Sequence, residues 1–202
     1  GSEMCIRDSY HALKAELRQD GLLGGIGDEG GFAPNLPSNE DGLRYLVRAI
    51  EAAGYSTEQM GIALDVASTE FHRDGAYHID GQAIDSEGLA DLYSGWLDEY
   101  PILSIEDGFD EDDWLGWSRF TAREGHRVQI VGDDLFVTQS ERLARGIEMQ
   151  AANAMLVKVN QVGTVTETLE AMDLASRNGF NNVVSHRSGE TEDVTIADLC
   201  VC

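Results

Sequence analysis

Lysine is scarce in this chain of 202 residues, where 14 basic residues stand against 37 acidic ones and the only lysines are Lys14 and Lys158. The net charge of −23 disfavours nucleic-acid backbones and anionic membrane surfaces as partners, because like charges repel. Cations are the natural counterpart of such a chain. We therefore expect no nucleic acid and no membrane among its partners.

Cysteines and long apolar runs are also few. Cys5, Cys200 and Cys202 are odd in number and lie near the two ends, without the spacing of a zinc site or a disulfide framework. No apolar stretch approaches the roughly 20 residues that cross a bilayer, and no secretory leader is recognisable. We expect a cytoplasmic location and, at 42% hydrophobic content, a single domain over residues 1–202.

Five short apolar runs each end in a charged side chain. A charge at the carboxyl end of a buried strand is costly unless it performs chemistry. The runs and their ends are 61–65 with Asp65, 102–106 with Glu106, 128–133 with Asp133, 154–158 with Lys158, and 182–186 with His186 followed by Arg187. Their regular recurrence is typical of repeated strand-plus-helix units.

Helix and turn signals separate the runs. Ser38 can cap a helix, Thr164 with Glu167 has the spacing of a capping box, and Asp74-Gly75 predicts a hairpin turn. Alternating strands and helices, with charged residues at one end of the strands, predict an α/β fold of the (β/α)8 TIM-barrel type. The barrel is incomplete, because about five of the eight strand-helix units are present and such barrels take about 250 residues.

Asp65, Glu106 and Asp133 should converge if their strands are parallel neighbours. Two carboxylates about 4 Å apart repel by roughly 4 kcal/mol at an effective dielectric near 20, so three of them call for a cation. Ligands that are all oxygen favour a hard ion such as Mg²⁺. The alternative is that each acid caps a helix or forms a salt bridge after its strand.

Lys158 comes next in strand order and should point at the same place. A neighbouring cation and partial burial would favour the neutral amine, which is the form that accepts a proton. A metal and a base together suit removal of a proton beside a carboxylate, because the metal can hold the charge that develops. The alternative is a lysine held in a structural ion pair.

Two loops add ligand-binding candidates. The segment 27–35 is rich in glycine and can bring Glu29 close to a ligand, although such turns are often only turns. The segment 185–193 places Arg187 and a hydroxyl between a strand and a helix, a plausible clamp for a phosphate or a carboxylate. Arg187 could instead pair with Glu190 or Glu192.

Six segments together resemble the enolase family, from about Tyr10 to Val201. They are GDEGGFAPN (27–35), ALDVASTEF (63–71), SIEDGFDEDDW (104–114), VGDDLFVT (131–138), LVKVNQVGT (156–164) and VSHRSGETED (184–193). The resemblance implies a Mg²⁺-dependent lyase of glycolysis, which dehydrates 2-phosphoglycerate, a phosphorylated hydroxy acid, to phosphoenolpyruvate. It also implies that the full-length parent is a homo-oligomer.

The resemblance assigns a role to each candidate residue. The implied roles are metal binding for Asp65, Glu106 and Asp133, removal of the C2 proton for Lys158, protonation of the leaving C3 hydroxyl for Glu29, and phosphate binding for Arg187 and Ser188 with His186 nearby. A base of this kind beside one or two Mg²⁺ ions is general in the superfamily.

The chain also departs from the family pattern. An N-terminal domain, two early barrel strands and a last strand with a phosphate-binding lysine are missing, and residues 5–9 resemble a foreign insertion. We therefore expect a fragment that is inactive alone. Two other functions stay open: a superfamily enzyme acting on an unphosphorylated acid, and an acidic metal- or partner-binding module without catalysis, whose open strand edges could pair with another chain.

Overall fold

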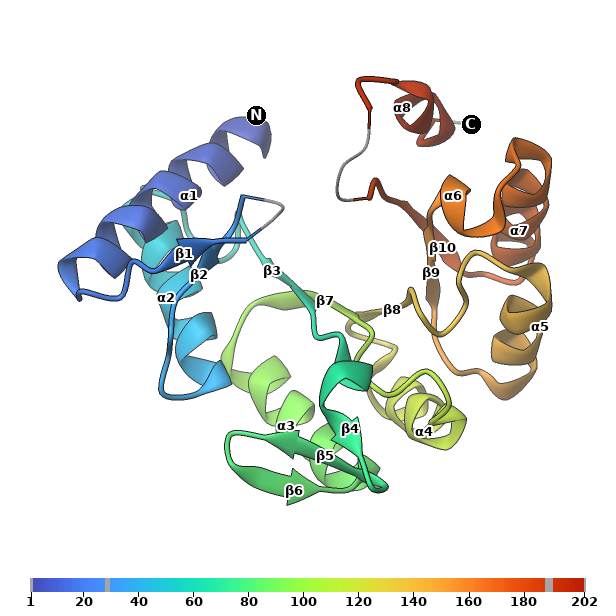
Figure 1. Ribbon diagram of the computed structural model, residues 1–202, viewed down its shortest axis with the longest axis horizontal. Helices are drawn as coiled ribbons and strands as arrows, with labels where there is room; N and C mark the ends of the chain where they lie inside the picture. Colours follow the sequence, from blue (N-terminus) through green and yellow to red (C-terminus); the bar gives the residue numbers. More distant parts are fainter. Residues whose placement is uncertain (1, 28–29, 188–190, 202) are drawn as a thin grey trace. The chain divides into compact units, whose positions relative to one another are not determined.

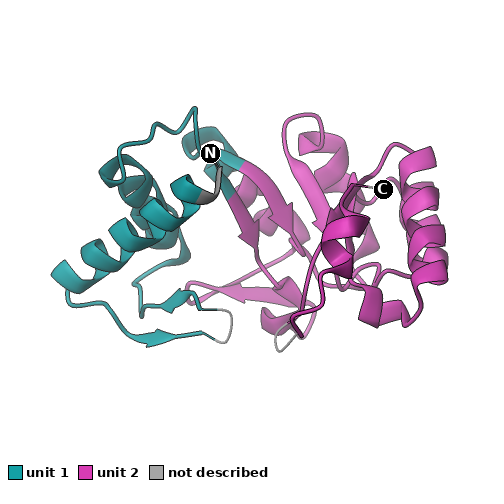
Figure 2. Cartoon of the chain, turned by 90° about the horizontal axis from the view of Figure 1, so that it is seen from above, with its two compact units in different colours: residues 1–62, 95–102 teal, residues 63–94, 103–202 magenta. Residues whose placement is uncertain are grey.

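The computed structural model describes residues 2–27, 30–187 and 191–201. These fall into two compact units, one of residues 1–62 and 95–102, the other of residues 63–94 and 103–202 (Figure 2). Two compact units within a chain can belong to one domain or to two, so the single domain over residues 1–202 stays a prediction.

The smaller unit contains a helix pair and a short hairpin. Its elements are α1 (Ser2–Gln19), β1 (Gly25–Ile26), β2 (Phe32–Ala33) and α2 (Asn39–Ala52). Arg48 of α2 forms an ion pair with Glu16 of α1, and the Tyr45 hydroxyl donates to Asp20 Oδ2 at 2.7 Å. Residues 5–9 continue α1 without a break. A continuous helix does not show where these residues come from, so the foreign insertion stays a prediction.

A five-stranded sheet organises the larger unit, and its strand order is β10-β9-β8-β7-β3 (Figure 1). The strands are β3 (Ile62–Asp65), β7 (Ile102–Glu106), β8 (Gln129–Gly132), β9 (Ala154–Val157) and β10 (Asn181–Val184), of which Ile62 and Ile102 count with the smaller unit. Neighbouring strands from β7 to β10 pair in parallel. The five predicted strands are confirmed, and they follow one another in space as they do along the chain.

Helices follow the strands, as the sequence predicts, and α5 and α7 lie along one side of β9 and β10 (Figure 1). The helices are α3 (Ser86–Glu99), α4 (Trp114–Glu124), α5 (Ser140–Met149), α6 (Val159–Val162), α7 (Val165–Arg177) and α8 (Thr195–Leu199). Two predicted caps are confirmed, because Ser38 accepts the Asp41 N–H at 3.3 Å and Thr164 accepts the Glu167 N–H at 3.2 Å. Within the described part of the chain, every helix falls short of the length or the apolar character needed to cross a bilayer.

A separate three-stranded sheet follows β3. After the 3-10 helix η1 (Ser68–Phe71) come β4 (His72–Arg73), β5 (Ala76–Ile79) and β6 (Gln82–Ile84), paired antiparallel. The predicted turn lies between β4 and β5, where Asp74 and Gly75 have φ of 54° and 76°. Positive φ at both central residues gives the twist that a two-residue hairpin needs.

The core of the larger unit has two parts. Val131, Ala154 and Leu156 are buried on neighbouring strands, with Val183 of β10 packed against them. The second part is a set of buried aromatic rings in edge-to-face or tilted contact, formed by Tyr77, Tyr93, Phe109, Trp117 and Phe120. Apolar and aromatic side chains fill both parts of this core, so the charged side chains that can bind a ligand lie at the ends of the strands.

Candidate metal and acid–base site

The predicted charged residues lie at the carboxyl ends of consecutive strands. Asp65 and Glu106 are the last residues of β3 and β7, and Asp133 and Lys158 directly follow β8 and β9. His186 lies two residues beyond β10, which ends before the predicted run does. Since the carboxyl ends of parallel strands meet at one edge of a sheet, this edge gathers three acids and one of the two lysines of the chain.

Lys158 and Asp133 form an ion pair in which the Lys158 ammonium donates to Asp133 Oδ2. Only 16% of the lysine side chain and 11% of the aspartate side chain are exposed. A charge this far from water needs a partner, and each of these groups supplies one to the other. The pair brings the predicted base into direct contact with a predicted metal ligand.

Burial and neighbouring acids raise the pKa of two carboxyl groups at this edge, Glu106 and Asp65. Burial, followed by the negative charges of Asp65 and Asp133, raises the pKa of Glu106 to about 8. Loss of solvent and the charge of Asp133 raise the pKa of Asp65, while Lys158 acts in the opposite direction. Carboxylates that repel one another in partly buried surroundings are stabilised by a cation, and an all-oxygen set of this kind fits a hard divalent ion.

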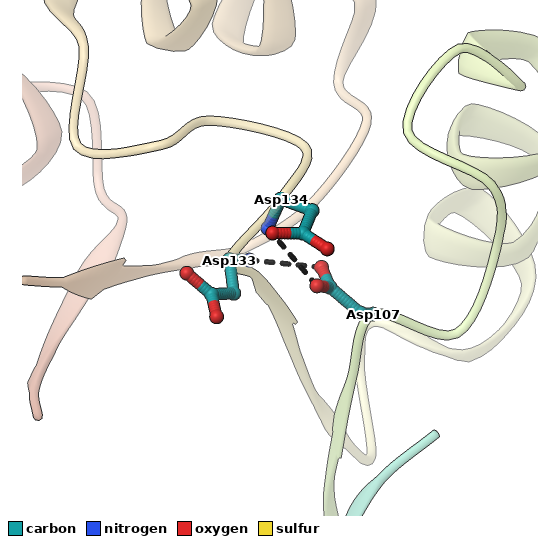
Figure 3. A group of neighbouring side chains, drawn as sticks. All are labelled: Asp107, Asp133 and Asp134. Atoms are coloured by element: carbon teal, nitrogen blue, oxygen red, sulfur yellow. Dashed lines mark hydrogen bonds between the residues drawn. The ribbon is translucent and has the colours of Figure 1, made fainter. Parts of the chain in front are cut away.

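Asp107 is a part of the site that the sequence reasoning did not single out. Its carboxylate accepts the backbone N–H of Asp133 and of Asp134, each at 2.9 Å (Figure 3). Burial raises the pKa of Asp107 to about 7, although the two hydrogen bonds act the other way. Its φ of 44° is left-handed, which the sequence could have suggested only through the turn-forming pair Asp107-Gly108.

Acidic side-chain oxygens of Asp107, Asp133 and Asp134 lie within 4.8 Å of one another. This group shares only Asp133 with the predicted metal ligands. Figure 3 shows the Asp107 carboxylate directed at the backbone of Asp133 and Asp134, while the Asp133 carboxylate points away from Asp107. The Asp107 carboxylate therefore holds this backbone in position, whereas the Asp133 carboxylate is turned toward Lys158.

Gln161 and Thr138 complete the polar surroundings of Asp133, and the sequence reasoning missed both. Gln161 Nε2 donates to Asp133 Oδ1 at 2.7 Å, and the Thr138 hydroxyl donates to Gln161 Oε1 at 2.6 Å. Thr138 belongs to the segment VGDDLFVT and Gln161 to the segment LVKVNQVGT. Neither side chain carries a charge that would single it out as a candidate site residue.

The predicted phosphate clamp is described only in part. Arg187 Nη1 donates to Asn160 Oδ1 at 3.3 Å, and the Ser185 hydroxyl donates to the His186 carbonyl at 3.0 Å. Ser188 and Glu190, like the predicted acid Glu29, lie outside the described residues. The assignments of Glu29, His186, Arg187 and Ser188 therefore stay predictions.

A parallel sheet with acids and a lysine at its carboxyl edge is the arrangement of a β/α-barrel enzyme, and comparison with known families agrees with it. Residues 4–202 match the family model for "Enolase, C-terminal TIM barrel domain". The chain belongs to this family, and the predicted α/β fold of TIM-barrel type is confirmed.

Curated relatives carry the name Enolase. The chain is 58% identical over 193 residues to Enolase of Beutenbergia cavernae, and 55% identical over 195 residues to that of Kineococcus radiotolerans. Enolase of Bifidobacterium animalis subsp. lactis is 56% identical over 195 residues. These matches cover 95–96% of the chain but 45% of each relative, so the chain spans less than half the length of the relatives it matches.

Proposed function

We propose that this chain supplies the metal site and the catalytic base of an enolase-type lyase, a cytoplasmic enzyme of glycolysis that converts 2-phosphoglycerate to phosphoenolpyruvate. The observation that carries the proposal is the contact of the Lys158 ammonium with Asp133, at the edge of the sheet where β3 ends in Asp65 and β7 ends in Glu106. The family match and the relatives named Enolase support it.

Asp65, Glu106 and Asp133 would hold the metal, for which Mg²⁺ is our choice because all three are oxygen donors. A bound divalent ion supplies positive charge for the substrate carboxylate and for the negative charge that develops on it. Asp107 holds the backbone here in place by accepting one hydrogen bond from the N–H of Asp133 and one from the N–H of Asp134. The raised pKa of Glu106 fits a site whose charges are balanced only when a cation is bound.

The reaction needs one proton removed and one delivered. Lys158 Nζ, as the neutral amine, takes the proton from C2 of 2-phosphoglycerate and becomes an ammonium beside Asp133. The electron pair of the broken C–H bond forms the C2–C3 double bond as the C3–O bond breaks. By the family resemblance, Glu29 gives the departing hydroxyl its proton, so that it leaves as water.

The phosphate end of the substrate would be held by Arg187 and Ser188, with His186 beside them. Arginine suits this part because its planar fork can make two hydrogen bonds to one phosphate. Competition by phosphate analogues separates this proposal from an enzyme acting on an unphosphorylated acid. Binding of Mg²⁺ without affinity for phosphorylated acids would instead favour the module without catalysis.

Proton exchange at C2 of 2-phosphoglycerate in D₂O tests the proposal, in the full-length protein that contains this chain. The Lys158→Ala variant is expected to lose exchange, because Lys158 is the one lysine of this chain that follows a strand of the sheet, Lys14 being in α1. Lys14→Arg, which alters the other lysine, is the matched control and should exchange as the parent does. Unchanged exchange in the Lys158→Ala variant would refute the assignment. The chain of 202 residues alone should turn over little substrate.

A further inference from the structure

A closed ring of hydrogen bonds surrounds the Asp133 carboxylate and the start of α6. Asp133 Oδ1 accepts from Gln161 Nε2 at 2.7 Å, and Asp133 Oδ2 accepts from Lys158 Nζ. Gln161 Oε1 accepts from the Thr138 hydroxyl at 2.6 Å, and the same hydroxyl accepts the backbone N–H of Lys158 at 3.0 Å. The ring therefore runs from the Lys158 ammonium through Asp133, Gln161 and Thr138 back to the backbone of Lys158.

The ring determines how the Gln161 amide is oriented. The Thr138 hydroxyl has one hydrogen and faces an N–H donor at Lys158, so it gives that hydrogen to an acceptor. Its contact of 2.6 Å with Gln161 Oε1 is much shorter than its contact of 3.4 Å with the Leu156 carbonyl. With Oε1 on this side, the amide N–H groups must face Asp133.

Thr138 is itself held rigidly. Its side chain is fully buried, and its backbone has φ of 56°, following Val137 with φ of 44°. The Asp133 carbonyl accepts the Val137 N–H at 2.7 Å and the Phe136 N–H at 3.1 Å, which closes the turn between Asp133 and Thr138. The hydroxyl that orients Gln161 is thus tied to the same turn that carries Asp133.

We propose that Gln161 is a positioning residue of the enolase-type site: it fixes the plane of the Asp133 carboxylate and, through it, the place of the Lys158 amine. A neutral N–H donor on one carboxylate oxygen restricts rotation of the group without adding a charge that competes for the cation. The inference rests on the proposed function for its consequence in catalysis, but the positioning itself is a property of the protein without metal.

The metal-free test uses the scarcity of lysine. Lysine labelled with ¹³C at Cε gives two signals in this chain, from Lys14 and Lys158, and a Lys14→Arg variant assigns them. Gln161→Ala should shift or broaden the Lys158 signal, because the carboxylate in contact with the amine loses its fixed orientation. The Lys14 signal should stay in place. An unchanged Lys158 signal would overturn the proposal.

The second test measures Mg²⁺ binding by calorimetry. Gln161→Ala should weaken binding about 10-fold or more, the usual effect of removing a partner that orients a metal ligand. Gln82→Ala, which removes the same side chain from the exposed strand β6, is the control and should bind as the parent does. An affinity within two-fold of the parent would contradict the proposal.

A double-mutant cycle separates positioning from general loss of stability. Thr138→Val removes the hydroxyl that orients Gln161, whereas Thr138→Ser keeps it and should restore the affinity. If both residues act through Asp133, Gln161→Ala combined with Thr138→Val should lose no more Mg²⁺ affinity than the weaker-binding single variant. Additive losses would overturn the proposal. If the parent chain binds no Mg²⁺ but the Lys158 signal still responds to Gln161→Ala, the positioning stands and the proposed function fails.

Discussion

The Asp107 carboxylate accepts the backbone N–H of Asp133 at 2.9 Å, so one acid at the strand edge fixes the main chain of another. Its second oxygen accepts the N–H of Asp134 at the same distance. Only 6% of Asp107 is exposed. Its main contribution is therefore to hold the β8 end in the conformation that presents Asp133 to Lys158.

Asp107→Ala should destabilise the protein by about 2–4 kcal/mol, because one buried and one partly buried N–H group lose their acceptor and alanine is disfavoured at a positive φ. Chemical denaturation measures the change. Asp173→Ala, at an exposed ion pair with Arg177 in α7, is the control and should change the stability by less than about 0.5 kcal/mol. Equal effects of the two substitutions would contradict the structural part given to Asp107.

The pH dependence of stability should reveal the raised pKa of Glu106. Between about pH 4.5 and pH 8 the folded metal-free protein holds more protons on this group than the unfolded chain does. The free energy of unfolding should therefore fall as the pH rises through this range. Glu106→Gln should make the fall shallower, and saturating Mg²⁺ should oppose it. A stability that rises from pH 5.5 to pH 8 in the metal-free parent would contradict the account.

Gly132 directly precedes Asp133 and has no room for a side chain. An added Cβ would lie 2.7 Å from the ring of Phe136, which is fully buried. Gly132→Ala should cost about 1–3 kcal/mol of stability through overpacking and should weaken Mg²⁺ binding by displacing Asp133. Gly95→Ala, in open space on α3, is the matched control and should be neutral or stabilising. Calorimetry of both variants, with and without Mg²⁺, checks the prediction.

Asn153 ties together the opposite end of the sheet. Its Oδ1 accepts the Ile130 N–H at 2.7 Å, and its Nδ2 donates to the carbonyls of Gly125 and Val128 at 3.1 Å and 3.0 Å. Asn153→Ala should cost about 2–4 kcal/mol, because several partly buried groups lose their partners. Mg²⁺ affinity of the folded protein should be unchanged, since this end serves stability. A large loss of affinity would argue that the two ends are coupled.

The sequence predicted those parts of the fold and site that depend on local pattern. Apolar runs indicated the five strands, and the caps at Ser38 and Thr164 marked helix starts, because these signals act within a few residues. The order of the strands also followed from the pattern, since short strand-helix units place consecutive strands side by side.

The positioning residues could not be predicted in the same way. Asp107 acts through a left-handed turn, and Gln161 through a hydroxyl 23 residues earlier in the chain, so their parts depend on folded geometry. The pairing of Lys158 with Asp133 was foreseen only as one alternative, because a charge on a strand end does not name its partner. The division of the chain into two compact units likewise left no local signal in the sequence.

The position of a bound divalent ion decides whether Asp65, Glu106 and Asp133 form the metal site. Crystals of the protein soaked with Mn²⁺, a surrogate for Mg²⁺ with a usable anomalous signal, would locate the ion. We expect one strong peak ligated by oxygens of Asp65, Glu106 and Asp133, at about 2.0–2.3 Å, close to the distances for hard cations. A peak held instead by Asp107 and Asp134, or no peak at this strand edge, would contradict it.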